Sequence, residues 1–339
     1  MSDFFEWAPT ADRSTLERYA TCPLSARLAE THIKSAGKMA AVGNEAHDAI
    51  SATISAYVDA GCPDDPSAQH WMSPAEINEL LVTNLRHSRP GLQPETLAAF
   101  AGTYRLAEIL HPIAPWAVLK HDGGQGERCG QMTEDVETSL GVVQATSEID
   151  LLAATQVKEI VRAIDWKTGW SEWSEGDVEH AFQMRMLAWL VLSTFPDADV
   201  VESQVYNSRT RRLTYPVRFT RDRMAEYAAQ VQEAAETWMR YRSAPISSVP
   251  AWPTREGCQQ CDAAAFCTVC DDDVGDANRS PETWLKILHA TECKADSIRK
   301  TLAEIVHKEQ RDITAGGMAF GLNKPKADRR PQCTLYETR

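Results

Sequence analysis

Long apolar runs, an ATP-binding loop and an excess of positive charge are all missing from this 339-residue chain. Its longest apolar run, 187–192, is far below the ~20 residues that a membrane helix requires. Its first residues, MSDFFEW, contain neither the basic nor the apolar region of a secretory signal. We therefore expect a soluble, cytoplasmic protein that does not enter a membrane.

The missing loop is the Gly-x4-Gly-Lys-Ser/Thr pattern that cradles ATP phosphates, so the chain has no recognisable motor for unwinding duplex. Its 35 basic and 48 acidic side chains give a formal net charge of −13. This charge disfavours nonspecific coating of nucleic acid, because phosphate binding depends on Lys and Arg displacing counterions. Any nucleic-acid contact must come from local basic patches.

Two segments with carboxylates and a lysine, 145–150 and 164–169, predict two adjacent β-strands. Side chains alternate between the faces of a strand with a rise of ~3.3 Å per residue. Asp165 and Lys167 then project from one face about 6.6 Å apart, while Trp166 points into the core. A surface strand with solvated charges is the alternative interpretation.

Asp150 is expected to oppose Asp165 across a strand spacing of about 4.8 Å. At that spacing two carboxylates are able to share a divalent cation. Without a metal or a lysine nearby, their mutual repulsion is costly, which argues against a purely structural cluster. Glu148 shares a face with Asp150 and is a second-tier candidate.

The sequence after these carboxylates predicts the rest of the local architecture. Residues 157–164 are apolar and β-branched, as in a buried strand, and 176–191 have the apolar spacing of a helix packed on that sheet. Gln183 lies one residue off the apolar stripe of this helix, so we expect it to face the carboxylates.

Taken together, Asp150, the run 165–169 and Gln183 resemble the core motifs of the RecB-like branch of the PD-(D/E)XK nuclease superfamily. That branch also has a Gly-x-x-x-His motif on an upstream helix, which Gly43 and His47 supply here. Four residues make about one helical turn, so both would face the same neighbour.

The resemblance implies an α/β fold with a restriction-endonuclease-like core, in which helices flank a central mixed sheet, and a helical N-terminal insertion. It also implies Mg²⁺ or Mn²⁺ as cofactor. Leu187 departs from the pattern, because the family often has a DNA-contacting tyrosine there. The implied metal ligands are His47, Asp150, Asp165 and the main-chain carbonyl of Trp166; the catalytic residues are Asp150, Asp165, Lys167 as the group that positions water, and Gln183 as an orienting group.

Four cysteines crowd into thirteen residues as Cys258-x2-Cys261-x5-Cys267-x2-Cys270. In a reducing compartment such crowding favours metal ligation over disulfides. One interpretation is a zinc site made by these four thiols.

The other interpretation recruits Cys22, whose segment 18–27 resembles the Cys-Pro segment of iron–sulfur members of the branch, including AddB-type and CRISPR-adaptation nucleases. We favour this cysteine-bound [4Fe–4S] cluster, which would tie distant parts of the chain together. Its ligands would be Cys22, Cys258, Cys261 and Cys267, with Cys270 as an alternative ligand.

The chain is expected to form two parts, a nuclease domain over 1–275 and a C-terminal helix with a basic tail over 276–339. The first part is helical over 14–111 and strand-rich over 131–219. A long helix near 220–242 and the cysteine loop follow. The C-terminal helix would be either a lid on the nuclease or a contact for another subunit.

Two basic patches interrupt the acidic background, one within 206–223 and one in the tail. Each is either a solvated surface or a track for DNA, and glycine and proline near the tail patch favour an extended arm. The candidate DNA-binding residues are Arg209, Arg211, Arg212, Lys324, Lys326, Arg329 and Arg330.

From the resemblance we expect a metal-dependent DNA exonuclease acting at DNA ends or on single strands, in phage or bacterial recombination and repair. Since no motor is present, a single-strand annealing protein or a helicase is the expected partner. The alternatives are a noncatalytic DNA-binding or assembly subunit that retains the nuclease fold, and a structure-selective endonuclease.

Overall fold

The computed structural model describes residues 8–32, 38–62, 69–89, 91–168, 172–252, Cys258, Cys261, Ala263, Cys267, 281–309, 313–315, 318–322 and 333–337. The chain forms two compact units. Unit 1 comprises 1–17 with 35–239, and unit 2 comprises 18–34 with 240–339. The expected division near residue 275 stays a prediction.

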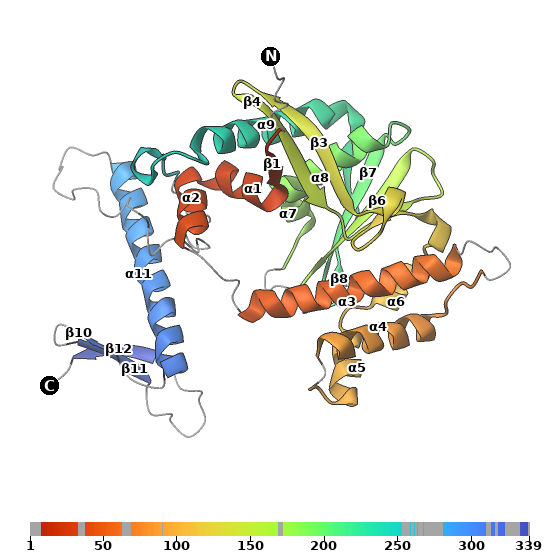
Figure 1. The fold of residues 1–339 in the computed structure, drawn as a ribbon, viewed down its shortest axis with the longest axis horizontal. Coiled ribbons are helices and arrows are strands. Elements are labelled where there is room, and N and C mark those ends of the chain that lie inside the picture. The colour runs from red at the N-terminus through yellow and green to blue at the C-terminus, as the bar shows by residue number, and fades with distance from the viewer. Residues whose placement is uncertain are drawn as a thin grey trace, which may run out of the picture. The chain divides into compact units, whose positions relative to one another are not determined.

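A six-stranded mixed sheet forms the centre of unit 1, in the order β2-β5-β6-β7-β8 with β9 also paired to β7 (Figure 1). Only the β6 and β7 pair is parallel. Its crossover connection contains α7 (Glu175–His180) and α8 (Phe182–Thr194), as a parallel pair requires. The expected mixed sheet flanked by helices is therefore confirmed. The strands are β2 (Val118–His121), β5 (Leu151–Ala154), β6 (Ile160–Lys167), β7 (Val200–Asn207), β8 (Arg212–Leu213) and β9 (Val217–Thr220).

A second sheet in unit 1 has the order β1-β4-β3, with β1 (Thr10–Asp12), β4 (Gly141–Glu148) and β3 (Gln131–Thr138). The expected pairing of a strand over 145–150 with the Asp165 strand is wrong. A tight turn lets β4 pair with β3 over its whole length, and Gly141 adopts the positive φ of 124° that this turn needs. Asp150 instead lies after β4 and directly before β5, which is the strand that pairs with β6.

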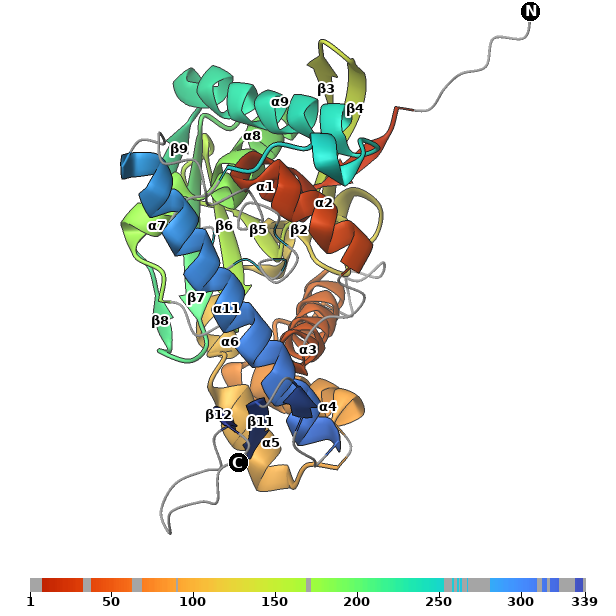
Figure 2. The same ribbon diagram turned by 90° about the vertical axis from the view of Figure 1, so that its left-hand side faces the viewer.

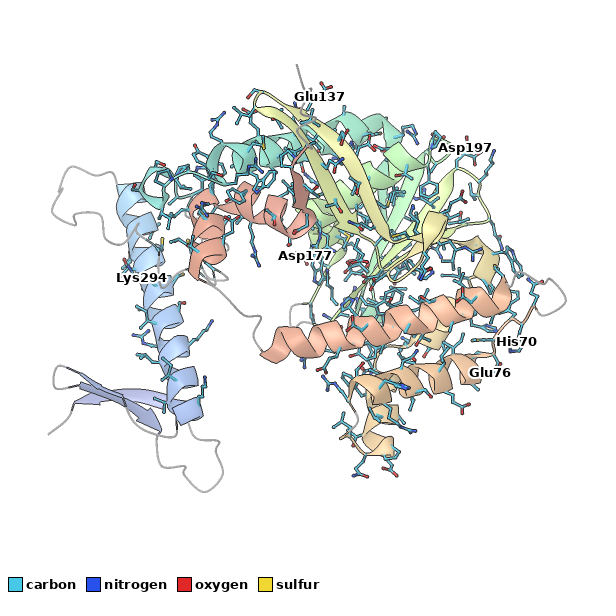
Figure 3. All side chains as sticks on the ribbon, in the orientation of Figure 1. His70, Glu76, Glu137, Asp177, Asp197 and Lys294 are labelled. Atoms are coloured by element: carbon cyan, nitrogen blue, oxygen red, sulfur yellow. The ribbon has the colours of Figure 1, made fainter. Side chains whose placement is uncertain are left out.

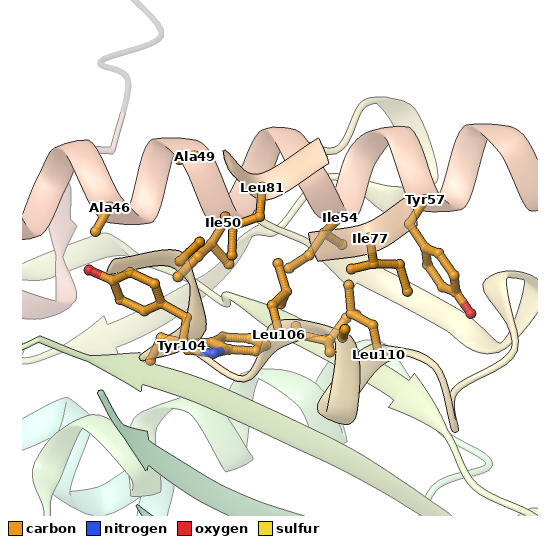
Figure 4. Packing of buried hydrophobic residues seen from close by; sticks show 14 of the residues in the cluster. Ala46, Ala49, Ile50, Ile54, Tyr57, Ile77, Leu81, Tyr104, Leu106 and Leu110 are labelled. Carbon is orange, nitrogen blue, oxygen red and sulfur yellow. The ribbon is translucent and has the colours of Figure 1, made fainter. Parts of the chain in front are cut away.

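The helical part of unit 1 packs on one face of the six-stranded sheet. In Figure 4 apolar side chains of α3 (Lys38–Gly61) and α4 (Pro74–Ser88) meet those around α6 (Leu106–Leu110). Buried side chains of the sheet join the same cluster, and α5 (Pro94–Gly102) contributes Leu97 and Ala101. The sheet contributes Val118, Leu151, Ile164, Trp166 and Tyr206.

On the other side of these strands, α8 packs against β7, and α9 (Met224–Tyr241) lies beside the β3 and β4 hairpin (Figures 1 and 2). Alternation along β6 places apolar side chains on one face of the sheet and polar side chains on the other. Ile164 and Trp166 join the helical core, and Trp166 is 1% exposed. Asp165 and Lys167 point to the opposite face, where they contact α8.

Two element boundaries differ from expectation. The predicted strand 157–164 begins instead at Ile160, because Val157 lies in a turn that accepts a hydrogen bond from the Ile160 N–H. The single helix predicted over 176–191 is interrupted at Ala181, whose ψ of 129° is extended. This break lets α8 start with its own orientation.

Unit 2 contains α2 (Pro23–His32), the end of α1 (Arg13–Thr21), α11 (Pro281–Glu309) and an antiparallel sheet of β10 (Ile313–Ala315), β11 (Met318–Leu322) and β12 (Cys333–Glu337). The C-terminal helix expected within 276–339 is confirmed as α11, and it packs against β11. The tail, expected to be an extended arm, includes β12. The tail positions assigned to DNA binding, Lys324, Lys326, Arg329 and Arg330, lie outside the described residues.

None of the helices in the described ranges is long and apolar enough to cross a membrane.

Candidate active site

The polar face of β6 carries a closed network of three side chains. The Lys167 Nζ lies 2.8 Å from Asp165 Oδ2 and donates a hydrogen bond of 2.9 Å to Gln183 Oε1. Gln183 Nε2 in turn donates to Asp165 Oδ1 at 2.5 Å. Gln183 therefore faces the carboxylate as its position off the apolar stripe predicted, and it holds both charged groups in place.

Asp150 reaches this network from the neighbouring strand. Its Oδ2 accepts a 2.7 Å hydrogen bond from the Trp166 N–H and lies 3.7 Å from His47 Nδ1. His47 is supplied by α3, where it lies one turn after Gly43. The structure thus brings His47, Asp150, Asp165, Lys167 and Gln183 together from four separate elements.

Burial controls the protonation of this site. Burial and, after it, the nearby Asp165 charge raise the pKa of Asp150 to about 8, against the opposing effects of the Trp166 N–H and Lys167. Burial also lowers the pKa of His47, so that the imidazole is neutral near pH 7. Metals bind neutral imidazole and ionised carboxylate, so His47 is in its ligating form, whereas Asp150 would release a proton when a cation binds.

Two further carboxyl groups adjoin the site. Asp122 follows β2, and its N–H donates to the Asp150 carbonyl at 3.2 Å. A hydrogen bond with Asp122, followed by burial, raises the pKa of Glu148 to about 7. The sequence predicted Glu148 only as a second-tier candidate. It did not predict Asp122, because β2 has only four residues and shows no clear alternation.

These residues fit a hard divalent cation. Asp165 Oδ2 is buried and, apart from its ion pair with Lys167, has no hydrogen-bond partner. Crowded carboxylate oxygens are the ligands that Mg²⁺ and Mn²⁺ prefer. Within the described part of the chain, no three His, Cys, Asp or Glu side chains already surround a common metal position. Asp165 is turned to Lys167 and Gln183, and Asp150 to the Trp166 N–H.

The exposed loop 209–212 is attached to the end of the catalytic strand. The Ser208 N–H donates to the Lys167 carbonyl at 3.0 Å, and Arg209 Nε donates to the Thr168 carbonyl at 3.0 Å. Strand register pairs Lys167 with Asn207, and Asn207 with Arg212. Paired residues project from the same face of a sheet, so Arg212 lies on the face of Lys167.

The remaining arginines of the 206–223 patch have structural partners. Arg218 pairs with the buried Glu202, which Arg162 also contacts. Arg221 donates to the carbonyls of Leu192, Phe195 and Ala198 and so caps the end of α8. Arg212 also has a partner, because its Nη2 lies 3.5 Å from Glu175 Oε1, and its side chain is about as exposed as that of Arg218. The arginines at 209–212 are therefore distinguished by their place at the end of β6 rather than by a lack of partners.

At the position of the family tyrosine, Leu187 is 3% exposed within α8 and cannot contact DNA. A different aromatic side chain adjoins the site. The Trp173 ring lies 5.6 Å from Lys167 Nζ, within the range of a cation–π contact.

The cysteine region belongs to unit 2. Cys22, Cys261 and Cys267 pack against one apolar cluster of Leu24, Leu28, Val249 and Ala263. The Trp252 N–H donates to Cys22 Sγ at 3.4 Å, and Ser25 Oγ lies 3.1 Å from Cys261 Sγ.

Lys294 of α11, labelled in Figure 3, donates to the Cys267 carbonyl at 3.0 Å. Cys258 precedes Cys261, whose N–H donates to the Cys258 carbonyl at 3.3 Å, and Cys270 lies outside the described residues. The described residues contain no ready-made metal-binding group here either.

Comparisons with known proteins agree with this site at the level of the family. No curated protein matches the chain. Sixteen chains of solved structures match, among them one titled "Crystal structure of SSO0001", with 11% identity, 72% of this chain and 93% of that chain covered, and a TM-score of 0.30. That superposition is too weak to support any argument.

A model of one nuclease family, described as the PD-(D/E)XK nuclease superfamily, matches residues 13–268, a range that contains every residue of the β6 site. The chain belongs to the PD-(D/E)XK nuclease superfamily.

Proposed function

We propose that this protein is a Mg²⁺- or Mn²⁺-dependent deoxyribonuclease that hydrolyses phosphodiester bonds at DNA ends or in single strands. The observation that carries the proposal is the convergence of His47, Asp150, Asp165 and Lys167 at one end of β6. Membership of the superfamily supports the same chemistry.

His47, Asp150 and Asp165 would hold the cation, together with the main-chain carbonyl of Trp166. When bound, a divalent ion polarises the phosphodiester and lowers the pKa of a water nucleophile. Lys167 is a fixed ammonium beside that position, because Gln183 Oε1 and the Trp173 ring hold its Nζ. It would orient the attacking water and stabilise charge on the phosphate.

Arg209, Arg211 and Arg212 would bind the DNA backbone next to the cleavage position. Their loop is hydrogen bonded to the last residues of the catalytic strand, and Arg212 shares a sheet face with Lys167. Lys324, Lys326, Arg329 and Arg330 are proposed as a second DNA contact on sequence grounds alone. A single-strand annealing protein or a helicase is the proposed partner, since the sequence has no ATP-binding loop.

We also propose that Cys22, Cys258, Cys261 and Cys267 bind a [4Fe–4S] cluster, with zinc as the alternative metal. Three of these thiols pack on the same apolar cluster, although Cys22 is far from the others in sequence. Purified protein with brown colour and iron would support the cluster. Colourless, zinc-containing protein after anaerobic preparation would support zinc instead.

The test of the nuclease is digestion of labelled linear and circular DNA with Mg²⁺ or Mn²⁺. End-dependent loss of linear DNA is the expected result, while nicked circles would indicate an endonuclease. Loss of neither would indicate a DNA-binding subunit. Lys158→Ala is a matched control for Lys167→Ala, because Lys158 forms an exposed ion pair with Asp197.

A further inference from the structure

Tyr215 is an exposed aromatic residue at the edge of the six-stranded sheet. It lies between β8 and β9, the two strands that pair with the outer side of β7. With an exposed fraction of 75%, it is the most exposed large hydrophobic residue in the described ranges. One exposed ring on a surface is ordinary, so the significance of Tyr215 depends on its surroundings.

The backbone that carries this ring is fixed. Thr214 is buried, its N–H donates to the Val205 carbonyl at 3.0 Å, and its carbonyl accepts from Gln204 Nε2 at 2.7 Å. The Tyr215 N–H donates to Glu175 Oε1 at 3.0 Å. A ligand that stacks on the ring therefore has little backbone to order, which removes one cost of binding.

The start of α7 connects Tyr215 to the active site. Glu175, the first residue of α7, accepts the Tyr215 N–H and also lies 3.5 Å from Arg212 Nη2. Two residues earlier, the partly buried Trp173 has its ring 5.6 Å from Lys167 Nζ. The helix itself packs on β7 and β9 (Figure 2). Both aromatic residues are thus held at this helix start, Trp173 beside Lys167 and Tyr215 beside the arginine loop.

Positive charge accompanies these rings. Arg209, Arg211 and Arg212 are three of four consecutive residues, with no acidic side chain among them, in a chain of net charge −13. Arg211 has a φ of 55°, which glycine and asparagine adopt more readily, so local backbone preference does not account for an arginine there. Phosphate groups are the natural complement of such a local basic surface.

Rings next to arginines are the combination that binds single-stranded nucleic acid. Arginines contact the phosphates, while unpaired bases stack on the aromatic faces. A base inside a duplex is already stacked between its neighbours, and it must be unpaired and unstacked before it can contact a ring in this way. The combination therefore favours a single strand over a duplex.

We infer that Tyr215 and Trp173 stack on unpaired bases and make this site specific for single-stranded DNA. The inference rests on the proposed function, because it names the substrate of the same site. A bound strand would extend from Tyr215 to Trp173, which places its backbone beside Lys167. The two aromatic residues would determine specificity, and neither would take part in the hydrolysis itself.

Tyr215 gives the sharper test of the two. Trp173→Ala would also remove a contact of Lys167, so a loss of cleavage would have two explanations. Tyr215→Ala removes an exposed ring, and Tyr215→Phe keeps the ring without its hydroxyl. The matched control is Trp116→Ala, because Trp116 is also exposed but precedes β2, whose other end leads to Asp122 and the active site.

The first experiment measures the affinity of the full chain for a fluorescent oligothymidine and for an abasic strand of the same length, by anisotropy in a metal chelator that prevents cleavage. We expect the wild type to bind the thymidine strand more tightly. Tyr215→Ala should weaken binding of the thymidine strand by about 5- to 150-fold, the range for one lost base–aromatic stack, and should leave binding of the abasic strand unaffected. Tyr215→Phe and Trp116→Ala should both match the wild type.

Equal wild-type affinity for the two strands, or no binding of either, would overturn the inference, and this comparison needs no variant. A Tyr215→Ala protein that keeps the wild-type preference for bases would overturn it as well. The same holds for a Tyr215→Phe protein that behaves like Tyr215→Ala, since the hydroxyl and not the ring would then be the contact.

The second experiment compares cleavage of a single strand and of a blunt duplex of the same sequence with Mn²⁺. We expect the wild type to have the higher kcat/KM for the single strand, and Tyr215→Ala to raise the KM for that strand more than it lowers kcat. Faster cleavage of the duplex, or a fall in kcat without a rise in KM, would overturn the inference and leave the nuclease itself standing. A wild type that cleaves neither DNA with Mg²⁺ or Mn²⁺ would instead remove the proposed function, whatever the binding assay shows.

Discussion

The two faces of β6 have opposite roles in one strand. Ile164 and Trp166 face the helical core and are buried among apolar side chains, which stabilises the fold. Asp165 and Lys167 face α8 and bring ionised groups into a poorly solvated site, which has a free-energy cost. Alternation along a single strand thus separates groups that stabilise the fold from groups that carry chemistry, so substitutions on the two faces should have different consequences.

The largest effect is expected from Trp166→Ala on the apolar face. Removing a fully buried indole should lower the free energy of unfolding by about 3–5 kcal/mol, because transfer and cavity terms add. Denaturant titration measures this loss, with Trp166→Phe as a milder control. Wild-type stability of the folded Trp166→Ala variant would contradict a stabilising role for this face.

Lys167→Ala on the polar face should reduce activity much more than it affects folding. We expect cleavage of DNA to fall by about 100- to 1000-fold, the scale of losing one preorganised electrostatic group, while the protein stays folded. Single-turnover cleavage at saturating Mg²⁺ measures the first quantity. Retained cleavage by Lys167→Ala, with Lys158→Ala behaving as the wild type, would refute the proposed role.

Gln183→Ala is expected to have an intermediate effect. Its amide contacts Asp165 and Lys167, so it positions other groups, and loss of such a residue lowers activity or metal affinity by about 10- to 100-fold. Gln183→Glu would sharpen the test, since the side chain keeps its shape and still accepts from Lys167. We expect it to repel Asp165 and to weaken cleavage as well.

The polar face should also give the metal-free protein a distinctive pH dependence. The pKa of Asp150 rises from its ordinary 3.8 to about 8 in the folded state, so the folded state binds this proton more tightly. Stability through this group is therefore lost as pH rises between these two values. We expect Asp150→Asn to raise the melting temperature in a metal chelator, and more at about pH 8 than at about pH 5. An increase that shrinks with rising pH would contradict the assigned pKa shift.

The smallest effect is expected in the arginine loop 209–212. Arg211→Ala with Arg212→Ala should reduce the dependence of DNA affinity on salt by about 0.7–0.9 in logarithmic slope for each lost phosphate contact. Arg223→Ala is the matched control, because Arg223 pairs with Glu226 in the same stretch of sequence. Equal slopes for the wild type and the double variant would remove this loop from the DNA path.

Local pattern was enough to predict much of the site. The alternation of Asp165, Trp166 and Lys167 and the helical position of Gln183 are set by the period of a single element, and the structure has them as expected. The family motifs also predicted that His47 and Asp150 belong to one site, although these residues lie far apart in the sequence.

The remainder depends on pairing between distant segments. Asp122 enters the site through the β2 and β5 ladder, and β4 belongs to another sheet because its hairpin with β3 forms locally. Arg218 pairs with Glu202, and Arg221 donates to carbonyls at the end of α8, so both arginines have partners within the protein. Composition and periodicity do not encode such partners, so a basic run in sequence overstates the surface that is open to DNA.

The central claim is that Asp150 and Asp165 hold a catalytic cation beside Lys167. The most direct measurement is anomalous diffraction from crystals of the full chain soaked in Mn²⁺. We predict a manganese peak bound by both carboxylates, with His47 as a further ligand. Crystals of DNA-cleaving protein with manganese bound elsewhere, and none at these two carboxylates, would contradict it.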